Sequence, residues 1–251
     1  MIEFMKELVV STKDILLRGA HEISEKGYAD YVTDADIAVQ NLITSKINEK
    51  YPDIAVVSEE NQKQGLDNKC FILDPIDGTT NFKYGLGFFG VSLAYCVDQK
   101  IECGVVYEPY RDELFYAVNG KGAFLNGNRI MVNTQKQLKH CLISVGTSPY
   151  QRDNTHKRFS LFEKIFDSCI DIRRLGAASL DICYTACGRI DGFFEDGLHI
   201  WDYAAAMIIL HEAGGKITDN MGNMIDLNNI KSDIVAGNSE INKQLINIIG
   251  G

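Results

Sequence analysis

Two aspartates, Asp74 and Asp77, lie three residues apart just after residues 70–73, an apolar run typical of a buried strand. The proline between them restricts the backbone, and Gly78 lets the chain approach a ligand closely. The two threonines that follow can present amide N–H groups and hydroxyls at a helix start, where anions bind. Such a segment can hold metal ions beside a phosphate. It can equally be a turn whose aspartates accept hydrogen bonds from local amides.

Three further acidic residues stand where chemistry is possible. Glu59 closely follows the apolar run 54–57, and an acid at the end of a buried strand is harder to explain as a solvated surface residue. Asp36 completes a Thr33-x-x-Asp36 pattern, which also resembles a capping box. Asp202 could stabilise the positive end of a helix. A purely structural role stays open for these last two residues.

The overall charge indicates how the protein would handle phosphate. The formal net charge of the 251-residue chain is −9. Nucleic-acid surfaces need clustered Lys and Arg, so we expect no nucleic-acid partner. An acidic protein that binds phosphate needs cations as intermediaries, and metal ions can supply them. Without an apolar run of membrane-spanning length or a secretory pattern at its start, the chain is expected to be cytoplasmic, with no membrane partner.

Hydrophobic periodicity predicts the elements that position these acids. We predict amphipathic helices over residues 3–22 and from Thr33 to just before Pro52. Short apolar runs predict a largely antiparallel sheet, with strands at residues 54–57, 71–73, 88–97, 101–107 and 114–118. Strands at 142–145, 171–174, 192–195 and 234–236 then alternate with helices at 155–168, 177–187, 201–213 and the C-terminus. We therefore predict two packed subdomains, 1–135 with most of the acids and 136–251 with Asp202.

The acidic segments in this order resemble the inositol monophosphatase family of metal-dependent sugar phosphatases. The resemblance covers nearly the whole chain and rests on residues 30–36, 58–60, 74–82, 176–178, 192–197, 201–202 and 212–215. It implies a layered αβαβα sandwich, a mixed α+β and α/β fold of the inositol monophosphatase and fructose bisphosphatase type.

The resemblance also implies a set of metal ligands. Glu59, Asp74 and the carbonyl of Ile76 would ligate one Mg²⁺ ion. Asp74, Asp77 and Asp202 would ligate a second, and a third, weaker ion would share Glu59. Hard oxygen ligands are what magnesium prefers, so the residue types agree with two to three Mg²⁺ ions per site.

By the same resemblance, Asp36, Thr79 and Glu59 are the catalytic residues. Thr79 and Asp36 would orient the attacking water on the first ion, while Gly78 and Thr79 would offer amides to the phosphate. The metal ions would neutralise the phosphate, activate the water and stabilise the leaving alkoxide.

The other end of the substrate is expected to contact residues from the second half of the chain. Gly176, Ala178 and Glu195 would meet the polyol, together with Asp77 and Asp202. Glu195 is the expected hydroxyl acceptor, and its alternative is an ordinary solvated acid.

The function implied is Mg²⁺-dependent hydrolysis of small polyol or sugar phosphate monoesters, with inositol monophosphate as the first substrate. A lithium-sensitive homodimer is also implied. The alternatives are a fructose 1,6-bisphosphatase or dual-specificity sugar phosphatase, and a non-catalytic regulatory protein with the same fold.

Overall fold

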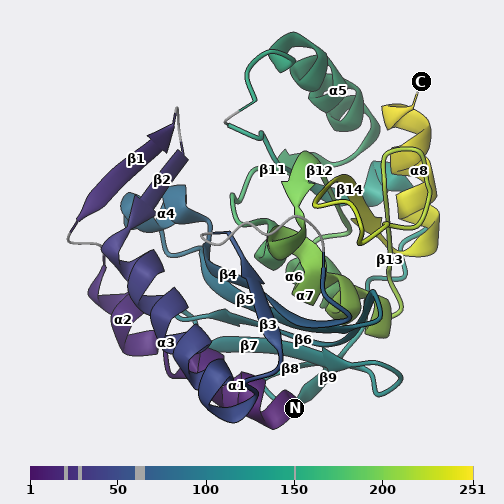
Figure 1. The fold of residues 1–251 in the computed structure, drawn as a ribbon. Coiled ribbons are helices and arrows are strands. Elements are labelled where there is room, and N and C mark those ends of the chain that lie inside the picture. Colours follow the sequence, from purple (N-terminus) through teal and green to yellow (C-terminus); the bar gives the residue numbers. More distant parts are fainter. Residues whose placement is uncertain (20–21, 28–29, 60–65, 150, 251) are drawn as a thin grey trace.

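Residues 1–19, 22–27, 30–59, 66–149 and 151–250, which the computed structural model describes, form five layers of helices and sheets (Figure 1). The outer helices on one side are α1 (Ile2–Val10), α2 (Lys13–Arg18) and α3 (Asp34–Lys50). They cover a seven-stranded sheet, and the middle layer consists of α6 (Ala178–Ala186) and α7 (Ile200–Glu212). A five-stranded sheet follows, covered by α5 (Thr155–Ser168) and α8 (Ser239–Ile249). The predicted αβαβα sandwich is therefore confirmed.

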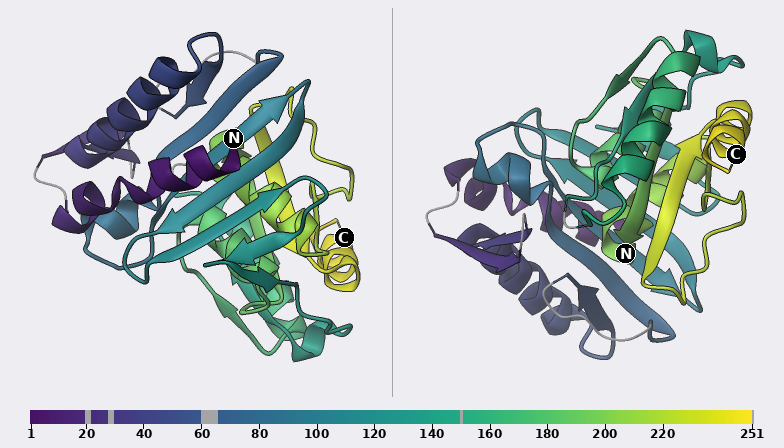
Figure 2. Two further views of the ribbon diagram at one scale, coloured as in Figure 1. Left: turned by 90° about the horizontal axis from the view of Figure 1, so that it is seen from below. Right: turned by 90° about the horizontal axis from the view of Figure 1, so that it is seen from above.

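The seven-stranded sheet has its strands in the order of the chain. They are β3 (Ala55–Ser58), β4 (Lys69–Asp77), β5 (Gly90–Val97), β6 (Lys100–Glu108), β7 (Glu113–Val118), β8 (Ala123–Leu125) and β9 (Asn128–Ile130). Only β3 and β4 are parallel to each other, and all later neighbours are antiparallel. Figure 2 shows α1 crossing one face of this sheet, with the C-terminal part of the chain on the other. The predicted, largely antiparallel sheet is confirmed.

The five-stranded sheet has the order β11-β10-β12-β14-β13. Its strands are β10 (Leu142–Val145), β11 (Asp171–Arg173), β12 (Gly192–His199), β13 (Lys216–Thr218) and β14 (Lys231–Gly237). The first three run parallel, and β14 is antiparallel to both its neighbours. A short turn of 3-10 helix, Leu138–His140, lies between the two sheets in the chain. The division near residue 135 stays a prediction.

Two small elements stand beside the main sheets. A hairpin of β1 (Ile23–Gly27) and β2 (Asp30–Thr33) precedes α3, and the short helix α4 (Thr79–Lys83) follows β4. Figure 1 shows the hairpin standing next to α4. These elements flank the segment that carries Asp74 and Asp77.

Three clusters of buried apolar side chains hold the layers together. One fills the space between the outer N-terminal helices and the seven-stranded sheet, and another lies between the five-stranded sheet and the pair α5 and α8. The largest lies between the two sheets, where Ile72 of β4, Phe193 of β12 and Leu210 of α7 belong to one cluster. The inner faces of both sheets therefore share a single core.

Helix α7 approaches strand β6 closely, and Gly104 makes this approach possible. A Cβ atom at Gly104 would lie 2.6 Å from the carbonyl oxygen of Ala205 and 2.8 Å from its Cα atom. These are backbone atoms of a buried helix, so they cannot rotate aside. Gly104 thus sets the distance between the sheet and the helix that carries Asp202.

The single helix predicted over residues 3–22 is wrong, because the chain forms α1 and α2 with a break between them. The Ser11 hydroxyl donates to the Leu8 carbonyl oxygen at 2.6 Å, and the Thr12 hydroxyl donates to the Val9 carbonyl oxygen at 2.7 Å. These bonds occupy carbonyls that a continuous helix would use, which favours a helix end.

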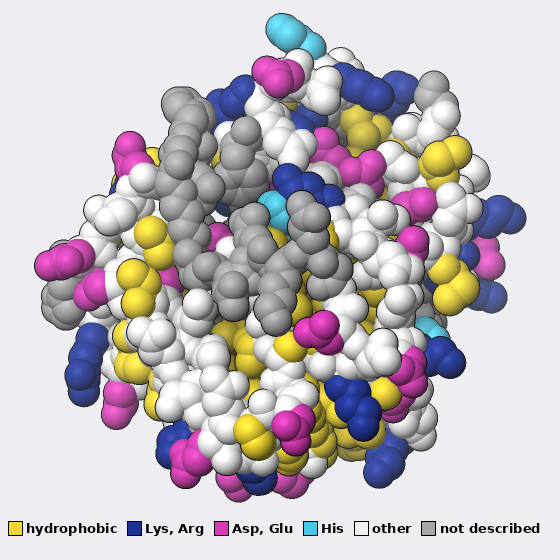
Figure 3. Space-filling view, viewed as in Figure 1, with side chains coloured by type: hydrophobic (Ala, Val, Ile, Leu, Met, Phe, Trp, Pro, Cys, Tyr) yellow, Lys and Arg dark blue, Asp and Glu magenta, His cyan; other side chains and the backbone are white. Residues whose placement is uncertain are grey.

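The surface in Figure 3 mixes both signs of charge. Lys and Arg side chains are interspersed with Asp and Glu on the face shown. Within the described part of the chain, no helix is both long enough and apolar enough to cross a membrane.

Candidate active site

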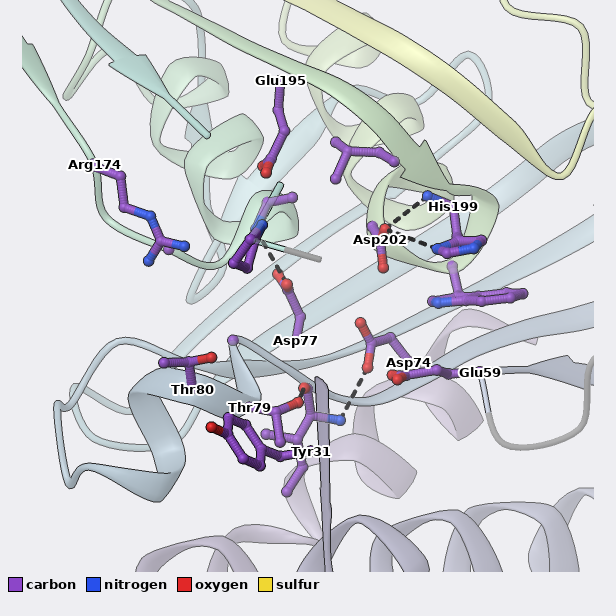
Figure 4. Close-up of a pocket in the computed structure, with 17 residues that line it drawn as sticks. Tyr31, Glu59, Asp74, Asp77, Thr79, Thr80, Arg174, Glu195, His199 and Asp202 are labelled. Carbon is purple, nitrogen blue, oxygen red and sulfur yellow. Dashed lines mark hydrogen bonds and ion pairs between the residues drawn. The ribbon is translucent and has the colours of Figure 1, made fainter. Parts of the chain in front are cut away.

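One cavity collects most of the predicted site residues, although they come from distant parts of the chain (Figure 4). The predicted residues that line it are Glu59, Asp74, Ile76, Asp77, Gly78, Thr79, Gly176, Ala178, Glu195 and Asp202. Glu59 directly follows β3, the aspartates of the motif end β4, and Asp202 lies in the first turn of α7. The fold thus brings together residues that no local motif connects.

A bulge at the end of β4 places Asp74 and Asp77. The register against β5 shifts between these two residues, so Asp74 pairs with Ser92 while Asp77 pairs with Gly90. One Asp74 carboxylate oxygen, Oδ1, accepts a hydrogen bond from the Ile76 amide at 3.1 Å. This is the local turn contact that a purely structural reading predicts, and it occupies only one of the acceptor positions of the carboxylate.

Gly78 turns the chain from the strand into α4. Its φ of 88° is left-handed, and a Cβ atom there would lie 3.0 Å from the Ala177 Cβ and 3.2 Å from the Gly176 carbonyl oxygen. Only glycine satisfies both constraints at little cost. Helix α4 then begins at Thr79, as predicted, and the Thr79 hydroxyl donates to the Ile76 carbonyl oxygen at 3.0 Å.

Asp77 connects the two halves of the chain. Its Oδ1 accepts from the Ala178 amide at 3.1 Å, and its Oδ2 accepts from the Ser179 amide at 2.7 Å and the Ser179 hydroxyl at 2.5 Å. These donors belong to the first turn of α6, so the carboxylate caps that helix from a distant part of the chain. The amides of Ala178 and Ser179 lie about a hundred residues from Asp77 in the sequence. Asp77 therefore does not form the local turn that was the alternative interpretation of this residue.

Asp202 caps a helix and also faces the cavity. Its Oδ2 accepts from the His199 amide at 2.7 Å, which caps the start of α7, and the carboxylate also lines the cavity. His199 stacks on Trp201 with ring centroids 4.6 Å apart and an interplanar angle of 9°. Burial lowers the pKa of His199 to about 4, so its ring is neutral near pH 7. This supports a structural role for the histidine.

The carboxylates of the cavity repel one another. Burial raises the pKa of Asp74 well above its usual range, and repulsion from four other acids adds to it; these are Glu59, Asp77, Asp202 and Asp36. Burial also raises the pKa of Asp77 to about 6, against the opposing hydrogen bonds from α6. Burial, then repulsion from Asp77 and Glu59, raises the pKa of Asp202 well above its usual range. The cavity therefore holds more negative charge than its surroundings balance.

This donor set fits a hard divalent cation. The carboxylate and carbonyl oxygens are the ligands that magnesium prefers, and a cation would offset their repulsion. Among the described residues, no three His, Cys, Asp or Glu side chains already form a ligand shell for an ion.

Asp36 is buried and is not among the residues that line the cavity. Its Oδ2 accepts from the Thr33 amide at 2.8 Å and the Thr33 hydroxyl at 2.6 Å, forming the predicted capping box of α3. Repulsion from Asp36 also raises the pKa of Asp74, although burial and the three acids that line the cavity have larger effects. Its catalytic role stays a prediction. Glu60, the last residue of the 58–60 motif, lies outside the described residues.

Glu195 enters the cavity from β12, opposite the aspartates (Figure 4). Its Oε1 accepts from the Ser148 amide at 3.0 Å. Burial raises the pKa of Glu195 to about 7, with the Ser148 amide opposing the shift. Glu195 is therefore a partly buried, hydrogen-bonded residue of the cavity, and the alternative of an ordinary solvated acid does not hold.

Several lining residues are absent from the predicted set. They are Tyr31, Thr80, Pro149, Arg174, Leu198, His199 and Trp201. Arg174 is the only Lys or Arg among the described residues that line the cavity, and its Nε donates to the Thr147 hydroxyl at 3.3 Å. The sequence indicates a possible site role for Arg174 through its position two residues before the 176–178 motif. Tyr31 belongs to the 30–36 motif, and the Lys83 ammonium lies 3.4 Å from the centre of its ring.

Known proteins resemble this chain over nearly its whole length. Residues 3–249 match the model of the Inositol monophosphatase family. Nus factor SuhB of Escherichia coli K12 is 38% identical over 229 residues, which cover 90% of this chain and 85% of that protein. Nus factor SuhB of Haemophilus influenzae is 39% identical over 244 residues, which cover 96% of this chain and 90% of that protein.

Solved structures agree over the same span. Extragenic suppressor protein suhB from Bartonella henselae has a TM-score of 0.92 at 35% identity, covering 99% of this chain and 97% of that one. An IMPase from Thermotoga maritima has a TM-score of 0.90 at 33% identity, covering 99% and 96%. Because the family match and these structures extend over nearly the whole chain, this protein belongs to the inositol monophosphatase family.

Proposed function

We propose that this protein is a Mg²⁺-dependent phosphatase that hydrolyses phosphate monoesters of small polyols or sugars, with inositol monophosphate as the first candidate substrate. The observation that carries the proposal is the cavity that Glu59, Asp74, Asp77 and Asp202 all line. A non-catalytic protein of this fold would not need to keep four mutually repelling acids together. Their retention favours catalysis over a purely regulatory role.

The residues of the cavity suit the steps of phosphate ester hydrolysis. Gly78 and Thr79 lie at the start of α4, where amide N–H groups can hold phosphate oxygens. The Thr79 hydroxyl donates to the Ile76 carbonyl oxygen, so its own oxygen can accept a hydrogen bond from the attacking water and orient it. Glu195 can accept hydrogen bonds from the hydroxyls of the leaving group. When bound, magnesium would supply charge neutralisation and water activation.

We expect hydrolysis to require magnesium. With a panel of phosphate monoesters, kcat/KM should be highest for a polyol or sugar phosphate in Mg²⁺, and turnover should disappear in excess chelator and return when Mg²⁺ is added. Calcium and lithium should inhibit, since they compete for the same oxygen ligands. Steady-state release of phosphate is the measurement. Full turnover in excess chelator would refute the metal requirement, whereas insensitivity to lithium would weaken only the choice of inositol monophosphate.

Arg174 favours a second candidate substrate class. A guanidinium at the rim of an otherwise acidic cavity suits a substrate with a second anionic group, because Arg pairs well with phosphate. Fructose 1,6-bisphosphate is the simplest sugar phosphate of this kind. Its rank against inositol monophosphate in the same panel decides between the two.

Replacing Glu195 with alanine should impair recognition more than chemistry. Loss of an acceptor for the hydroxyls of the leaving group should cost about 1–3 kcal/mol per contact. We therefore expect a higher KM for inositol monophosphate and a smaller effect on an aryl phosphate, which offers no hydroxyls to Glu195. Glu195→Gln, which keeps an acceptor oxygen, should lie between alanine and the native residue. Equal losses of kcat/KM on both substrates would contradict the role.

A further inference from the structure

An ion pair with a buried arginine stands next to Glu195. Arg158 of α5 points its guanidinium at Asp196, the residue that follows Glu195 in β12. Nε donates to Asp196 Oδ1 and a terminal nitrogen donates to Oδ2, both at 2.8 Å. The Arg158 side chain is only 3% exposed, and its remaining nitrogen donates to the Gln151 carbonyl oxygen at 2.9 Å. Such a two-point contact fixes both position and angle of the carboxylate.

Ser148 connects this ion pair to Glu195. Its hydroxyl has one proton and lies 2.6 Å from the Asp196 carbonyl oxygen, 3.1 Å from Asp196 Oδ1 and 3.4 Å from Glu195 Oε1. The closest contact takes the proton, so the Ser148 amide, at 3.0 Å, is the donor that holds Glu195. Ser148 has a φ of 39°, a left-handed conformation that a serine adopts only when its surroundings enforce it. The Asp196 carbonyl oxygen, which accepts the hydrogen bond from the Ser148 hydroxyl, supplies that constraint.

The space for the Glu195 carboxylate is limited on its other side. A Cβ atom at Gly146 would lie 1.9 Å from Glu195 Cδ. The carboxylate therefore rests against the bare backbone of Gly146 while the Ser148 amide holds one of its oxygens. Beyond Glu195, the register of β12 against β14 shifts before Leu198, which lets Asp196 turn toward α5.

We propose that Arg158 and Asp196 are positioning residues for Glu195, and that through Ser148 they determine the selectivity of this site for hydroxyl-bearing substrates. The inference rests on the proposed function, in which Glu195 meets the hydroxyls of the leaving group. Arg158 joins the Asp196 carboxylate to the Gln151 carbonyl oxygen, and the Gln151 amide donates to the Ser148 carbonyl oxygen at 2.9 Å. Without the guanidinium, the turn that carries Ser148 is no longer tied to β12, and the Ser148 amide loses its fixed place on Glu195. Helix α5 thus acts on the substrate without touching it.

The test compares two substrates, inositol 1-phosphate and p-nitrophenyl phosphate, in saturating Mg²⁺. Arg158→Met and Asp196→Asn should each raise KM for inositol 1-phosphate about tenfold, with a much smaller change for the aryl phosphate, since about 1.4 kcal/mol of hydroxyl binding is lost. Gly146→Ala should give the same loss of selectivity by displacing Glu195 directly. Arg189→Met is the matched control, because it removes another bidentate pair between an arginine and a carboxylate, that of Arg189 with Glu113, away from the cavity.

Double variants separate positioning from general stability. In a Glu195→Ala background, Arg158→Met should cause no further loss of selectivity, because the group it positions is gone. A crystal structure of Arg158→Met should show the Glu195 carboxylate away from the Ser148 amide. Additive losses on both substrates, or an unmoved carboxylate, would overturn the inference. If the native protein hydrolyses neither substrate, the proposed function fails, and the crystal structure still decides the positioning.

Discussion

Replacing Asp202 with asparagine is expected to leave the protein folded but to lower kcat by about a hundredfold or more, about 2.7 kcal/mol of transition-state stabilisation. Asparagine keeps the side chain's size and an oxygen that can accept from the His199 amide, so the cap of α7 survives. What it removes is one negative charge facing the cavity, where a second magnesium would bind. Circular dichroism and steady-state kinetics on the purified variant measure the two effects separately.

The alternative for Asp202 predicts the opposite result. If this carboxylate only caps α7, asparagine should preserve both stability and turnover, and a near-normal kcat at saturating magnesium would remove Asp202 from the site. Asp219→Asn is a suitable control, because Asp219 also accepts backbone amides, from Met221 and Asn223, in an exposed turn. It should change neither quantity appreciably.

Replacing Gly104 with alanine is expected to give the largest loss of stability from a single methyl group, about 2–3 kcal/mol in the free energy of unfolding. The new Cβ atom would lie within 3 Å of two backbone atoms of Ala205, so α7 must move away from β6. Because α7 carries Asp202, kcat should fall as well. Urea unfolding measures the first effect, and phosphate release measures the second.

Gly250→Ala provides the control for this substitution. Gly250 has an ordinary φ of −85° at the end of α8, and its nearest neighbour, the Ile246 carbonyl oxygen, would lie 3.3 Å from a new Cβ atom. Its effect on the free energy of unfolding should stay within about 0.5 kcal/mol. A similarly small effect of Gly104→Ala would mean that the contact between β6 and α7 is loose.

Elements governed by local chemistry could be predicted closely from the sequence. The capping box of α3 depends only on Thr33 and Asp36, and it forms as the pattern predicts. Helix α5 and strand β10 have the predicted bounds, because each has a clear apolar pattern between polar segments. Residues Ser11 and Thr12 show the limit of periodicity, since their hydroxyl contacts end a helix without interrupting its apolar pattern.

Other elements escaped prediction for physical reasons. The strands of the β1–β2 hairpin are short and polar, so they have no apolar alternation to detect. The β8–β9 hairpin is also absent from the predicted elements, although Asn126-Gly127 is a strong turn signal. Both residues have positive φ, 48° and 82°, as a two-residue hairpin turn requires.

The site was predictable in its residue types but not in its internal contacts. The resemblance supplied Asp77 as a ligand, yet its capping of α6 depends on how the two sheets pack against each other. The Arg158–Asp196 pair likewise becomes visible only when β12 and α5 lie together. Contacts between distant segments are set by the fold, and a single sequence does not encode them as a pattern.

The shared core between the sheets has a consequence for fragments of this protein. A polypeptide ending near residue 135 would expose the face of the seven-stranded sheet that α7 covers, including Ile72 and Val106, to water. Its counterpart would keep Asp202 but lose the strand that supplies Asp74 and Asp77. Neither fragment would therefore fold stably alone. Activity from a split gene would require the two pieces to fold around each other, as in fragment complementation.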